Sequence, residues 1–206
     1  KRLARLLGVR MVEVDTAEMT DPRYSANPAD RCYYCKAELF RRLRRVAARE
    51  GASTILCGAN ADDAGDYRPG LAAAKDMGVR QPLMEAGLTK GDIRAASLSM
   101  GLETWNKPSM ACLASRIPYG KSITPDILAR VEQSEYVLKD LGFSQCRVRD
   151  HGALARIEVS ADEMVKLLSL RGRIDQSLRS LGYVYVAVDL VGFRSGSMNE
   201  ALHLST

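Results

Sequence analysis

The first hundred residues alternate between segments with helical periodicity and short strand-like segments, and this alternation constrains the fold more than any other feature of the sequence. The clearest strand candidate is the run at 53–57, which is typical of a strand buried on both faces of a parallel sheet. Alternation of this kind predicts an α/β layer with a parallel sheet. We expect helices at 1–7, 37–49, 71–77 and 89–100, and strands at 11–15, 53–57 and 79–83.

The second half of the chain has a different order of predicted helices and strands. Thr124 and Pro125 are an N-cap followed by proline at the first helical position, which predicts a helix that ends at Gly142. Two strands, a helix and a strongly β-forming run follow, so this half predicts a small α+β domain with an antiparallel sheet. The expected strands are 143–149, 154–159 and 183–190, and the expected helix is 160–181. We therefore place one domain at 1–120 and a second at 121–206.

The charge balance narrows the class of partner. The formal net charge of +5 is mild for 206 residues, and no long basic run with interleaved aromatic residues occurs, so nucleic-acid binding is not favoured. No apolar run approaches the length of a membrane span, so we expect no membrane partner. Small anionic substrates such as nucleotides fit this mild positive charge better than nucleic acids do. The chain opens without Met, and we expect it to be part of a longer protein.

The sequence contains five cysteines, an odd number, and we expect no secretory signal. This combination indicates a reducing cytoplasm, where closely spaced cysteines bind metals or take part in catalysis. Cys32 and Cys35 have such a Cys-x-x-Cys spacing. Cys57, in the predicted buried strand, and Cys146, in a predicted hairpin, are interpreted as structural.

A cysteine, a serine and an arginine stand within five residues of one another in the stretch 108–120, which we call the thiol loop. Prolines near both of its ends predict an ordered loop and not a helix. An arginine four residues from a cysteine can favour the thiolate, and the guanidinium of Arg116 could also bind a carboxylate or phosphate beside Ser115. A small buried cysteine in a proline-bounded connector is the alternative interpretation.

Cys32, Cys35 and Cys112 together supply three thiolates. Three thiolates can bind three irons of a [4Fe–4S] cluster and leave one iron open. They can equally bind zinc with one open position, or carry out thiol–disulfide exchange. The residues alone leave these alternatives open, together with a cysteine pair that is merely buried at the start of a helix.

Arg147 and Arg149 alternate along a predicted strand, so both side chains point to one face of the sheet. Two guanidinium groups on one face suit a phosphate or a bis-carboxylate, and a solvated sheet face is the alternative. Glu158 lies on the paired strand and Glu135 on the preceding helix. These carboxylates either bind a divalent cation or pair with the arginines.

Asn60 and Asp63 follow the predicted buried strand, at the end where open α/β sheets bind ligands. A turn built from residues that favour turns is the alternative. The polar tail at 194–199 could return to the site. His151 and His203 are interpreted as ordinary turn and terminal residues.

Several stretches, in the same order along the chain, resemble the LarE family of ATP-dependent sulfur transferases. That family makes the nickel-pincer nucleotide cofactor of lactate racemase and related enzymes. The resemblance covers nearly the whole chain, and Cys112-Leu-Ala-Ser-Arg116 is its most specific part. The matching stretches are 27–36, 58–63, 66–70, 108–120, 147–149 and 189–199.

The resemblance implies a fold and a reaction. The fold is an N-terminal PP-loop ATP-pyrophosphatase domain followed by a smaller α+β domain. The family uses ATP and Mg²⁺ to adenylate a carboxylate of pyridinium-3,5-biscarboxylic acid mononucleotide. Sulfur then displaces AMP, and two rounds give the bis-thiocarboxylate. Because the family tends to form oligomers, a homo-oligomer is expected.

The resemblance also implies roles for the matching residues. In one subgroup the cysteine matching Cys112 gives up its sulfur and is left as dehydroalanine. In another, three cysteines bind a [4Fe–4S] cluster whose open iron carries an extra sulfide, and the presence of Cys32, Cys35 and Cys112 resembles this type. The sulfide can be replaced, whereas a sacrificed side chain permits a single turnover. Substrate contacts are expected at Ser115, Arg116, Arg147 and Arg149, nucleotide contacts at Asn60 and Asp63, and metal or interface roles at Glu135 and Glu158.

One feature of the family does not occur in this sequence. The Ser-Gly-Gly-x-Asp-Ser loop, which cradles the ATP pyrophosphate, is missing, and pyrophosphate binding needs such a glycine-rich cradle. This stretch of chain alone is therefore not expected to adenylate a substrate, and we expect the loop to lie outside it. The rival functions are another PP-loop enzyme, such as a tRNA thiolase or an amidotransferase synthetase, and a non-catalytic zinc- or cluster-binding module.

Overall fold

The computed structural model of the chain describes residues 1–65, 67–107 and 110–194. The chain folds into two compact units. The first unit contains 1–24 and 30–107, and the second contains 25–29 and the chain after residue 107. Parts of the sequence interpretation lie outside the described residues, namely Asp66, the first two residues of the thiol loop (108–109), the tail at 195–199 and His203.

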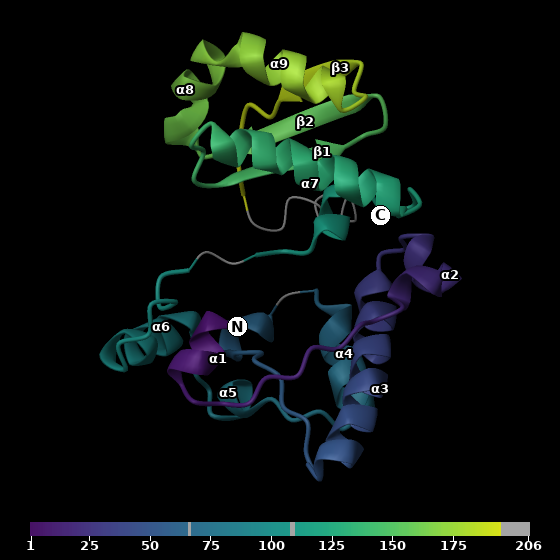
Figure 1. Ribbon diagram of the computed structural model, residues 1–206, viewed down its shortest axis with the longest axis vertical. Coiled ribbons are helices and arrows are strands. Elements are labelled where there is room, and N and C mark those ends of the chain that lie inside the picture. The colour runs from purple at the N-terminus through teal and green to yellow at the C-terminus, as the bar shows by residue number, and fades with distance from the viewer. Residues whose placement is uncertain (66, 108–109, 195–206) are drawn as a thin grey trace. The chain divides into compact units, whose positions relative to one another are not determined.

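The first unit is mainly helical, with α3 and α4 packed against each other (Figure 1). The helices predicted at 1–7, 71–77 and 89–100 are confirmed to within two residues. Helix α6 begins with a capping box, in which the Thr89 side chain accepts a hydrogen bond from the Asp92 N–H and the Asp92 side chain accepts one from the Thr89 N–H. The α-helices are α1 (Arg2–Leu6), α2 (Pro22–Ser25), α3 (Arg31–Glu50), α4 (Pro69–Asp76), α5 (Pro82–Glu85) and α6 (Lys90–Ser99), with 3₁₀ turns η1 (Glu18–Thr20) and η2 (Ala61–Asp63).

Helix α3 begins at Arg31, six residues earlier than the predicted start at 37. The cysteine pair therefore lies in the first turn of a helix and not in the loop before it. The helix ends at Gly51, whose φ of +68° is the left-handed conformation that glycine adopts without strain. None of the described helices is both long enough and apolar enough to cross a membrane.

The parallel sheet predicted for the first unit is reduced, among the described residues, to one isolated parallel bridge between Leu56 and Arg80. The Cys57 N–H donates to the Arg80 carbonyl at 2.9 Å, and the Arg80 N–H donates to the Ile55 carbonyl at 3.0 Å. The strand expected at 11–15 does not form. A parallel ladder is stable where both faces are covered, and the Leu56 residue is 60% exposed here.

The second unit is an α+β fold around a three-stranded sheet. The Thr124 side chain accepts the Ile127 N–H at 3.2 Å and so caps α7 as predicted. The hairpin of β1 and β2 is antiparallel, which is confirmed, whereas β3 pairs parallel to β2 and makes the sheet mixed. The elements are η3 (Leu113–Arg116), α7 (Pro125–Asp140), β1 (Cys146–Asp150), β2 (Leu154–Val159), η4 (Ala161–Glu163), α8 (Met164–Ser169), α9 (Arg171–Ser180) and β3 (Tyr185–Val188).

The parallel pairing of β3 has a topological cause. The segment at 160–181, predicted as one helix, is divided into η4, α8 and α9, with a break at Leu170. These helices carry the chain from the end of β2 back to its beginning, and a crossover of this length joins parallel strands. The predicted antiparallel sheet is therefore wrong for its third strand.

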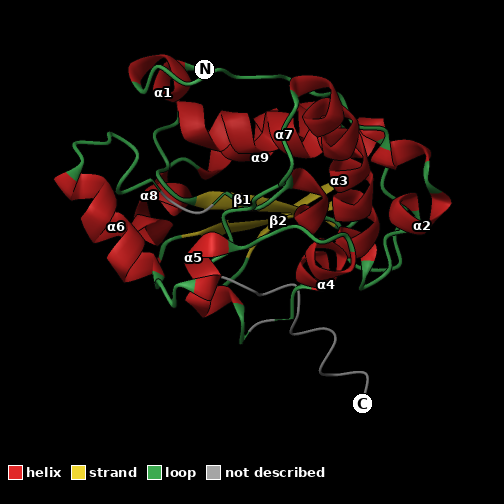
Figure 2. Ribbon diagram, turned by 90° about the horizontal axis from the view of Figure 1, so that it is seen from below, coloured by secondary structure: helices red, strands yellow, loops and turns green. Residues whose placement is uncertain are grey.

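The two faces of this sheet differ in character. One face is apolar and packs with α7 and α9, which lie together on one side of the strands (Figure 2). Val148 and Ile157, both 0% exposed, are paired on this face. Arg147 and Glu158 are paired across the strands on the opposite face, because successive side chains of a strand alternate. The strands that build the core therefore also position a charged surface.

The short segment 25–29 belongs to the second unit because Asn27 binds the thiol loop. Asn27 is fully buried with φ of +57°, and its Nδ2 donates to the carbonyls of Pro118 at 2.8 Å and Lys121 at 2.9 Å. The Asn27 carbonyl accepts the Gly120 N–H at 2.9 Å. These contacts attach the segment 25–29 to the second unit. The units divide after residue 107, so the thiol loop, which the sequence analysis placed in the first domain, belongs to the second unit.

We expect the substitution Leu178→Ala to destabilise the second unit. Leu178 is 0% exposed in its core, so the change removes buried apolar contacts and leaves a cavity. The free energy of unfolding, measured by urea denaturation, should fall by about 2–5 kcal/mol. Leu168→Ala is the matched control, because Leu168 is 56% exposed and its loss should change that value by less than about 0.5 kcal/mol. Equal effects of the two substitutions would contradict this description of the core.

Candidate functional site

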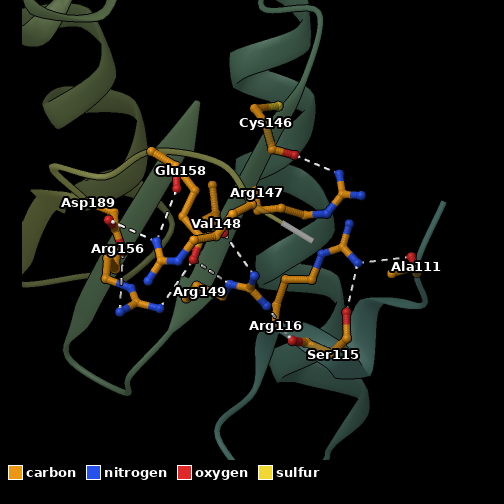
Figure 3. Close-up of polar contacts among 12 residues, drawn as sticks. Ala111, Ser115, Arg116, Cys146, Arg147, Val148, Arg149, Arg156, Glu158 and Asp189 are labelled. Carbon is orange, nitrogen blue, oxygen red and sulfur yellow. Dashed lines mark hydrogen bonds and ion pairs between the residues drawn. The ribbon is translucent and has the colours of Figure 1, made fainter. Parts of the chain in front are cut away.

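The candidate site lies where the charged face of the sheet meets the thiol loop in the second unit (Figure 3). Arg116, at the end of η3, is 3% exposed and forms a two-pronged ion pair with Glu135 of α7. Its Nε donates to Glu135 Oε1 at 2.8 Å, and its Nη2 donates to Oε2 at 3.0 Å. Geometry of this kind gives a strong charge-assisted interaction.

The remaining donors of Arg116 hold the thiol loop itself. Nη1 donates to the carbonyl of Ala111 at 2.9 Å, to the carbonyl of Cys112 at 2.8 Å and to Oγ of Ser115 at 3.0 Å. Figure 3 shows this guanidinium beside Ala111 and Ser115. The sequence suggested Arg116 as a substrate contact. The geometry favours an anchoring role, because all three of its nitrogens donate to protein groups.

Glu135 connects this anchor to the sheet. Besides its two bonds to Arg116, its Oε1 accepts the backbone N–H of Val148 on β1 at 3.2 Å. A continuous chain of hydrogen bonds therefore runs from β1 through Glu135 and Arg116 to the carbonyl of Cys112. The thiol loop is thus held in a fixed position relative to the sheet.

Arg149 makes a second contact between the sheet and the thiol loop. Its Nε and Nη2 donate to the two oxygens of Glu158, each at 2.8 Å, and its Nη1 donates to the Ser115 carbonyl at 2.7 Å. Arg156 adds a bond from Nη2 to Glu158 Oε1 at 3.2 Å, and its Nη1 lies 3.5 Å from an oxygen of Asp189. The 3₁₀ turn of the loop is therefore held by buried arginines from two directions.

Among the described residues of the site, cationic side chains outnumber carboxylates. Its cationic side chains are Arg116, Arg147, Arg149, Arg156 and Arg194, and its carboxylates are Glu135, Glu158 and Asp189. Within this described part of the site, the five positive charges exceed the three negative charges by two. Burial lowers the pKa of the Arg147 guanidinium, and the nearby charge of Arg116 lowers it further. Such a surplus suits an anion with two charges, such as a phosphate or a bis-carboxylate.

Cys112 combines a fixed backbone with an exposed side chain. Its carbonyl accepts hydrogen bonds from Arg116, from the Ser115 N–H at 3.0 Å and from the Ser115 hydroxyl at 2.7 Å. The residue itself is exposed, so the interpretation of a small buried cysteine is wrong for this position. The predicted loop contains one 3₁₀ turn, η3, directly after Cys112. This geometry presents a thiol from a rigid support.

Cys32 and Cys35 belong to the first unit, in the first turn of α3. Both are partly exposed thiols, and residues three apart on a helix share one side of it. Within the described ranges of each unit, no group of three or more histidine, cysteine or acidic side chains is arranged to hold a metal ion. Cys112 belongs to the other unit, so a meeting of the three thiols stays a prediction.

Glu135 and Glu158 have both carboxylate oxygens bound by guanidinium groups. Each is buried, at 3% and 0% exposure respectively. Of the two roles that the sequence left open for them, the contacts favour pairing with arginine, since a cation would have to displace a buried ion pair. A metal role stays a prediction.

Asn60 and Asp63 build a capping box around η2 in the first unit. Asp63 Oδ2 accepts the Asn60 N–H at 3.1 Å, and the Asn60 side chain accepts the Asp62 N–H at 3.2 Å. The other oxygen of Asp63 lies 3.0 Å from Arg68 Nη1 and 3.6 Å from Lys90 Nζ. The local contacts of Asn60 and Asp63 are therefore those of a capped turn, which was the alternative interpretation. A nucleotide contact of these residues stays a prediction.

Sequence reasoning missed three residues of the site. Arg156 stands two positions before Glu158 on β2 and shares its face, so strand alternation could have identified it. Asp189 follows β3, whose parallel pairing brings it to the arginines, and no local signal predicts that pairing. Asn27 has a positive φ and precedes a proline, a pattern that indicates a turn but not its partner.

Comparison with curated proteins gives three relatives. An uncharacterized protein of Synechocystis is 43% identical over 202 residues, which cover 97% of this chain and 75% of the relative. The pyridinium-3,5-bisthiocarboxylic acid mononucleotide synthase of Lactiplantibacillus plantarum is 40% identical over 200 residues, covering 97% of this chain and 72% of that protein. An uncharacterized protein of Methanocaldococcus jannaschii is 25% identical over 189 residues, covering 92% and 71%. No protein-family model matches the chain.

We predict that the thiols react with iodoacetamide in a defined order, with Cys112 first and Cys146 last. Cys112 is exposed, whereas burial raises the pKa of the Cys146 thiol to about 11. At pH 8 only about one Cys146 thiol in a thousand would be ionised. Mass spectrometry of the native protein over time measures the order. Cys112→Ser should remove the fast phase, and rapid labelling of Cys146 would show that its burial is described wrongly.

We expect Arg116→Lys to loosen the thiol loop. Lysine keeps the positive charge, but its single nitrogen cannot replace the two bonds to Glu135 and the three bonds to loop acceptors. The free energy of unfolding should therefore fall by about 2–3 kcal/mol. Amide hydrogen exchange at 113–116 should accelerate, as read by mass spectrometry. Arg173→Lys is the control, because Arg173 is exposed on α9 and should leave both readings unchanged. Unchanged exchange in the Arg116 variant would disprove the anchoring role.

Proposed function

The chain belongs to the LarE family of pyridinium-3,5-bisthiocarboxylic acid mononucleotide synthases, and from this premise we propose that it inserts sulfur into a pyridinium mononucleotide. The protein is an enzyme. We propose that it converts pyridinium-3,5-biscarboxylic acid mononucleotide into the bis-thiocarboxylate, at the expense of ATP. The observation that carries this proposal is an exposed thiol, Cys112, on a loop held by buried arginines beside a surplus of positive charge.

The charges of the site support a substrate of this class. The proposed substrate carries two carboxylates and one phosphate, and the site has two more arginines than carboxylates. We propose that Arg147, which is only partly buried, contacts a substrate anion directly. Arg149, Arg116 and Ser115 act beside it, with Arg116 and Arg149 also fixing the loop that carries Cys112. Guanidinium groups recognise both carboxylate and phosphate with paired hydrogen bonds.

ATP is the second substrate in this proposal. A substrate carboxylate oxygen attacks the α-phosphorus of ATP, and pyrophosphate leaves with Mg²⁺. The acyl adenylate then accepts sulfur at its carbonyl carbon, and AMP leaves with the former carboxylate oxygen. We propose that this activation belongs to a PP-loop fold that includes the first unit, with Asn60 and Asp63 near the nucleotide. The polar cluster of Asp63, Arg68 and Lys90 supports that assignment.

For the sulfur source we propose a [4Fe–4S] cluster bound by Cys32, Cys35 and Cys112. All three are thiols with partly or fully exposed residues, and the first two share one helical turn. The segment 25–29, which belongs to the second unit with Cys112, ends two residues before α3 begins. When bound, a cluster with one open iron would supply a replaceable sulfide. The alternative is that Cys112 donates its own sulfur, with cleavage of its Cβ–Sγ bond and loss of its α-proton, which leaves dehydroalanine.

We further propose a cytoplasmic homo-oligomer. The cysteines occur as thiols, which suits a reducing compartment. Large apolar side chains near the end of β3 are exposed in the second unit, including Leu190 at 95% and Val191 at 70%, and oligomeric contact would cover such surface.

The proposal is tested by anaerobic purification of the full-length protein and assay with the biscarboxylate mononucleotide. We expect AMP release that depends on that substrate, and a brown protein with sulfur-to-iron charge-transfer absorption. Cys32→Ala should reduce the iron content to background, whereas Cys57→Ala should not, because Cys57 packs beside the core of the first unit. Iron that persists in the Cys32 variant would disprove the ligand assignment.

A colourless protein that loses the mass of H₂S during turnover would instead establish Cys112 as the sacrificial donor. A protein that binds metal but releases no AMP when the substrate is added would overturn the synthase proposal. A metal-binding module would then be the remaining function. The two readouts, iron content and AMP release, therefore separate failure of the sulfur source from failure of the reaction.

A further inference from the structure

A cavity of about 470 Å³ lies in the first unit, between the segment 17–22 and α3. It is within the size range of small-molecule sites. No residue of this cavity has a role in the proposed reaction. Its charged lining consists of Glu18, Asp21, Glu38, Arg41, Arg42 and Arg45.

Two of the three carboxylates in the cavity are fully engaged. Glu38 accepts from Arg42 Nε at 2.8 Å and pairs with Arg41, and the hydrogen bond from Arg42 is the main reason that its pKa is lowered. Asp21 accepts from the backbone and side chain of Arg23, at 2.8–3.0 Å, and its pKa is lowered chiefly by the Arg23 side chain. Because these ion pairs already occupy the oxygens of Glu38 and Asp21, the two carboxylates have little capacity left to bind a ligand.

The other two charged side chains of the cavity, Glu18 and Arg45, can still form hydrogen bonds with a ligand. Glu18 Oε2 is buried and accepts no hydrogen bond from any residue that the structure describes. A buried carboxylate oxygen without a donor is costly, so this atom calls for an unseen partner. Arg45 is exposed and has no ion-pair or hydrogen-bond partner within the described ranges. The cavity therefore offers one acceptor and one cation.

These two groups define a ligand with complementary chemistry. An anion satisfies Arg45, but an anion without a proton would repel the Glu18 carboxylate. A ligand that carries both a negative charge and an O–H donor satisfies both groups at once. We propose that this cavity binds a small protonated oxyanion, of which monohydrogen phosphate is the simplest example, with its O–H directed to Glu18 and its charged oxygens to Arg45.

The position of the cavity on α3 is defined by helical spacing. Glu38, Arg42 and Arg45 follow Cys35 at intervals of three, four and three residues, so all four share one side of the helix. The cavity thus begins one turn beyond the cysteine pair, in the first unit. Its residues are separate from the arginines of the second unit, and the inference does not depend on the proposed reaction.

The inference is tested by comparing phosphate with sulfate, two tetrahedral oxyanions of similar size. Sulfate carries no proton at pH 7.5, whereas monohydrogen phosphate keeps one. We expect phosphate to bind at least about tenfold more tightly than sulfate, a difference of about 1.4 kcal/mol, as measured by isothermal titration calorimetry. Glu18→Gln should abolish this preference, because an amide N–H can donate to sulfate.

Arg45→Gln should weaken phosphate binding about tenfold, in line with the loss of a charge-assisted bond. Arg44→Gln is the matched control, since Arg44 lies on the same helix and donates to the Met77 carbonyl outside the cavity. Circular dichroism checks that each variant is folded. The proposal is overturned by equal affinity for the two anions, by an equal effect of the Arg44 and Arg45 substitutions, or by absence of phosphate binding at millimolar concentration.

Discussion

The Arg116 guanidinium is a full positive charge in a residue that is 3% exposed, and the geometry of the candidate site depends on how that charge is compensated. Burying an unpaired charge would cost several kcal/mol. Glu135 compensates the charge, and the carbonyls of Ala111 and Cys112 with the Ser115 hydroxyl use the remaining donors. Because every one of these acceptors is on the thiol loop or on the helix behind it, the loop has one favourable arrangement. The thiol of Cys112 is presented by that arrangement.

The sheet of the second unit links stability to the site. Val148 and Ile157 fill the core from one face, while Arg149 and Glu158 meet on the other. A slip of one residue between β1 and β2 would exchange the two faces, bury the arginines in the apolar core and expose the core residues. The hydrophobic core therefore fixes the register that brings the ion pairs together. The positive surplus of the site is a property of the fold and not of the loop alone.

Local signals predicted the parts of the fold that local interactions build. The cap at Thr124, the helix at 89–100 and the strand at 154–159 could each be predicted from neighbouring residues. The parallel pairing of β3 could not be read in this way, because it depends on how a whole crossover returns the chain. The same limit applies to the site. The sequence singled out Arg116 and Glu135 separately, but their anchoring contact joins segments 19 residues apart, and no periodic pattern encodes it.

In the proposed reaction, the sulfur donor must satisfy two opposed requirements. It must be accessible, because the acceptor carbon has to approach the sulfur, and it must be held in place, because orientation supplies much of the rate of a reaction between bound groups. In the thiol loop the backbone of Cys112 meets the requirement of a fixed position, and its side chain meets the requirement of access. Arg116 and Ser115 fix the carbonyl of Cys112, while the residue stays exposed. This arrangement serves a ligand of an iron–sulfur cluster and a sacrificial donor equally well. The two proposed sulfur sources therefore differ in whether Cys32 and Cys35 bind the same cluster as Cys112, which is the point that the iron content of the Cys32 variant tests.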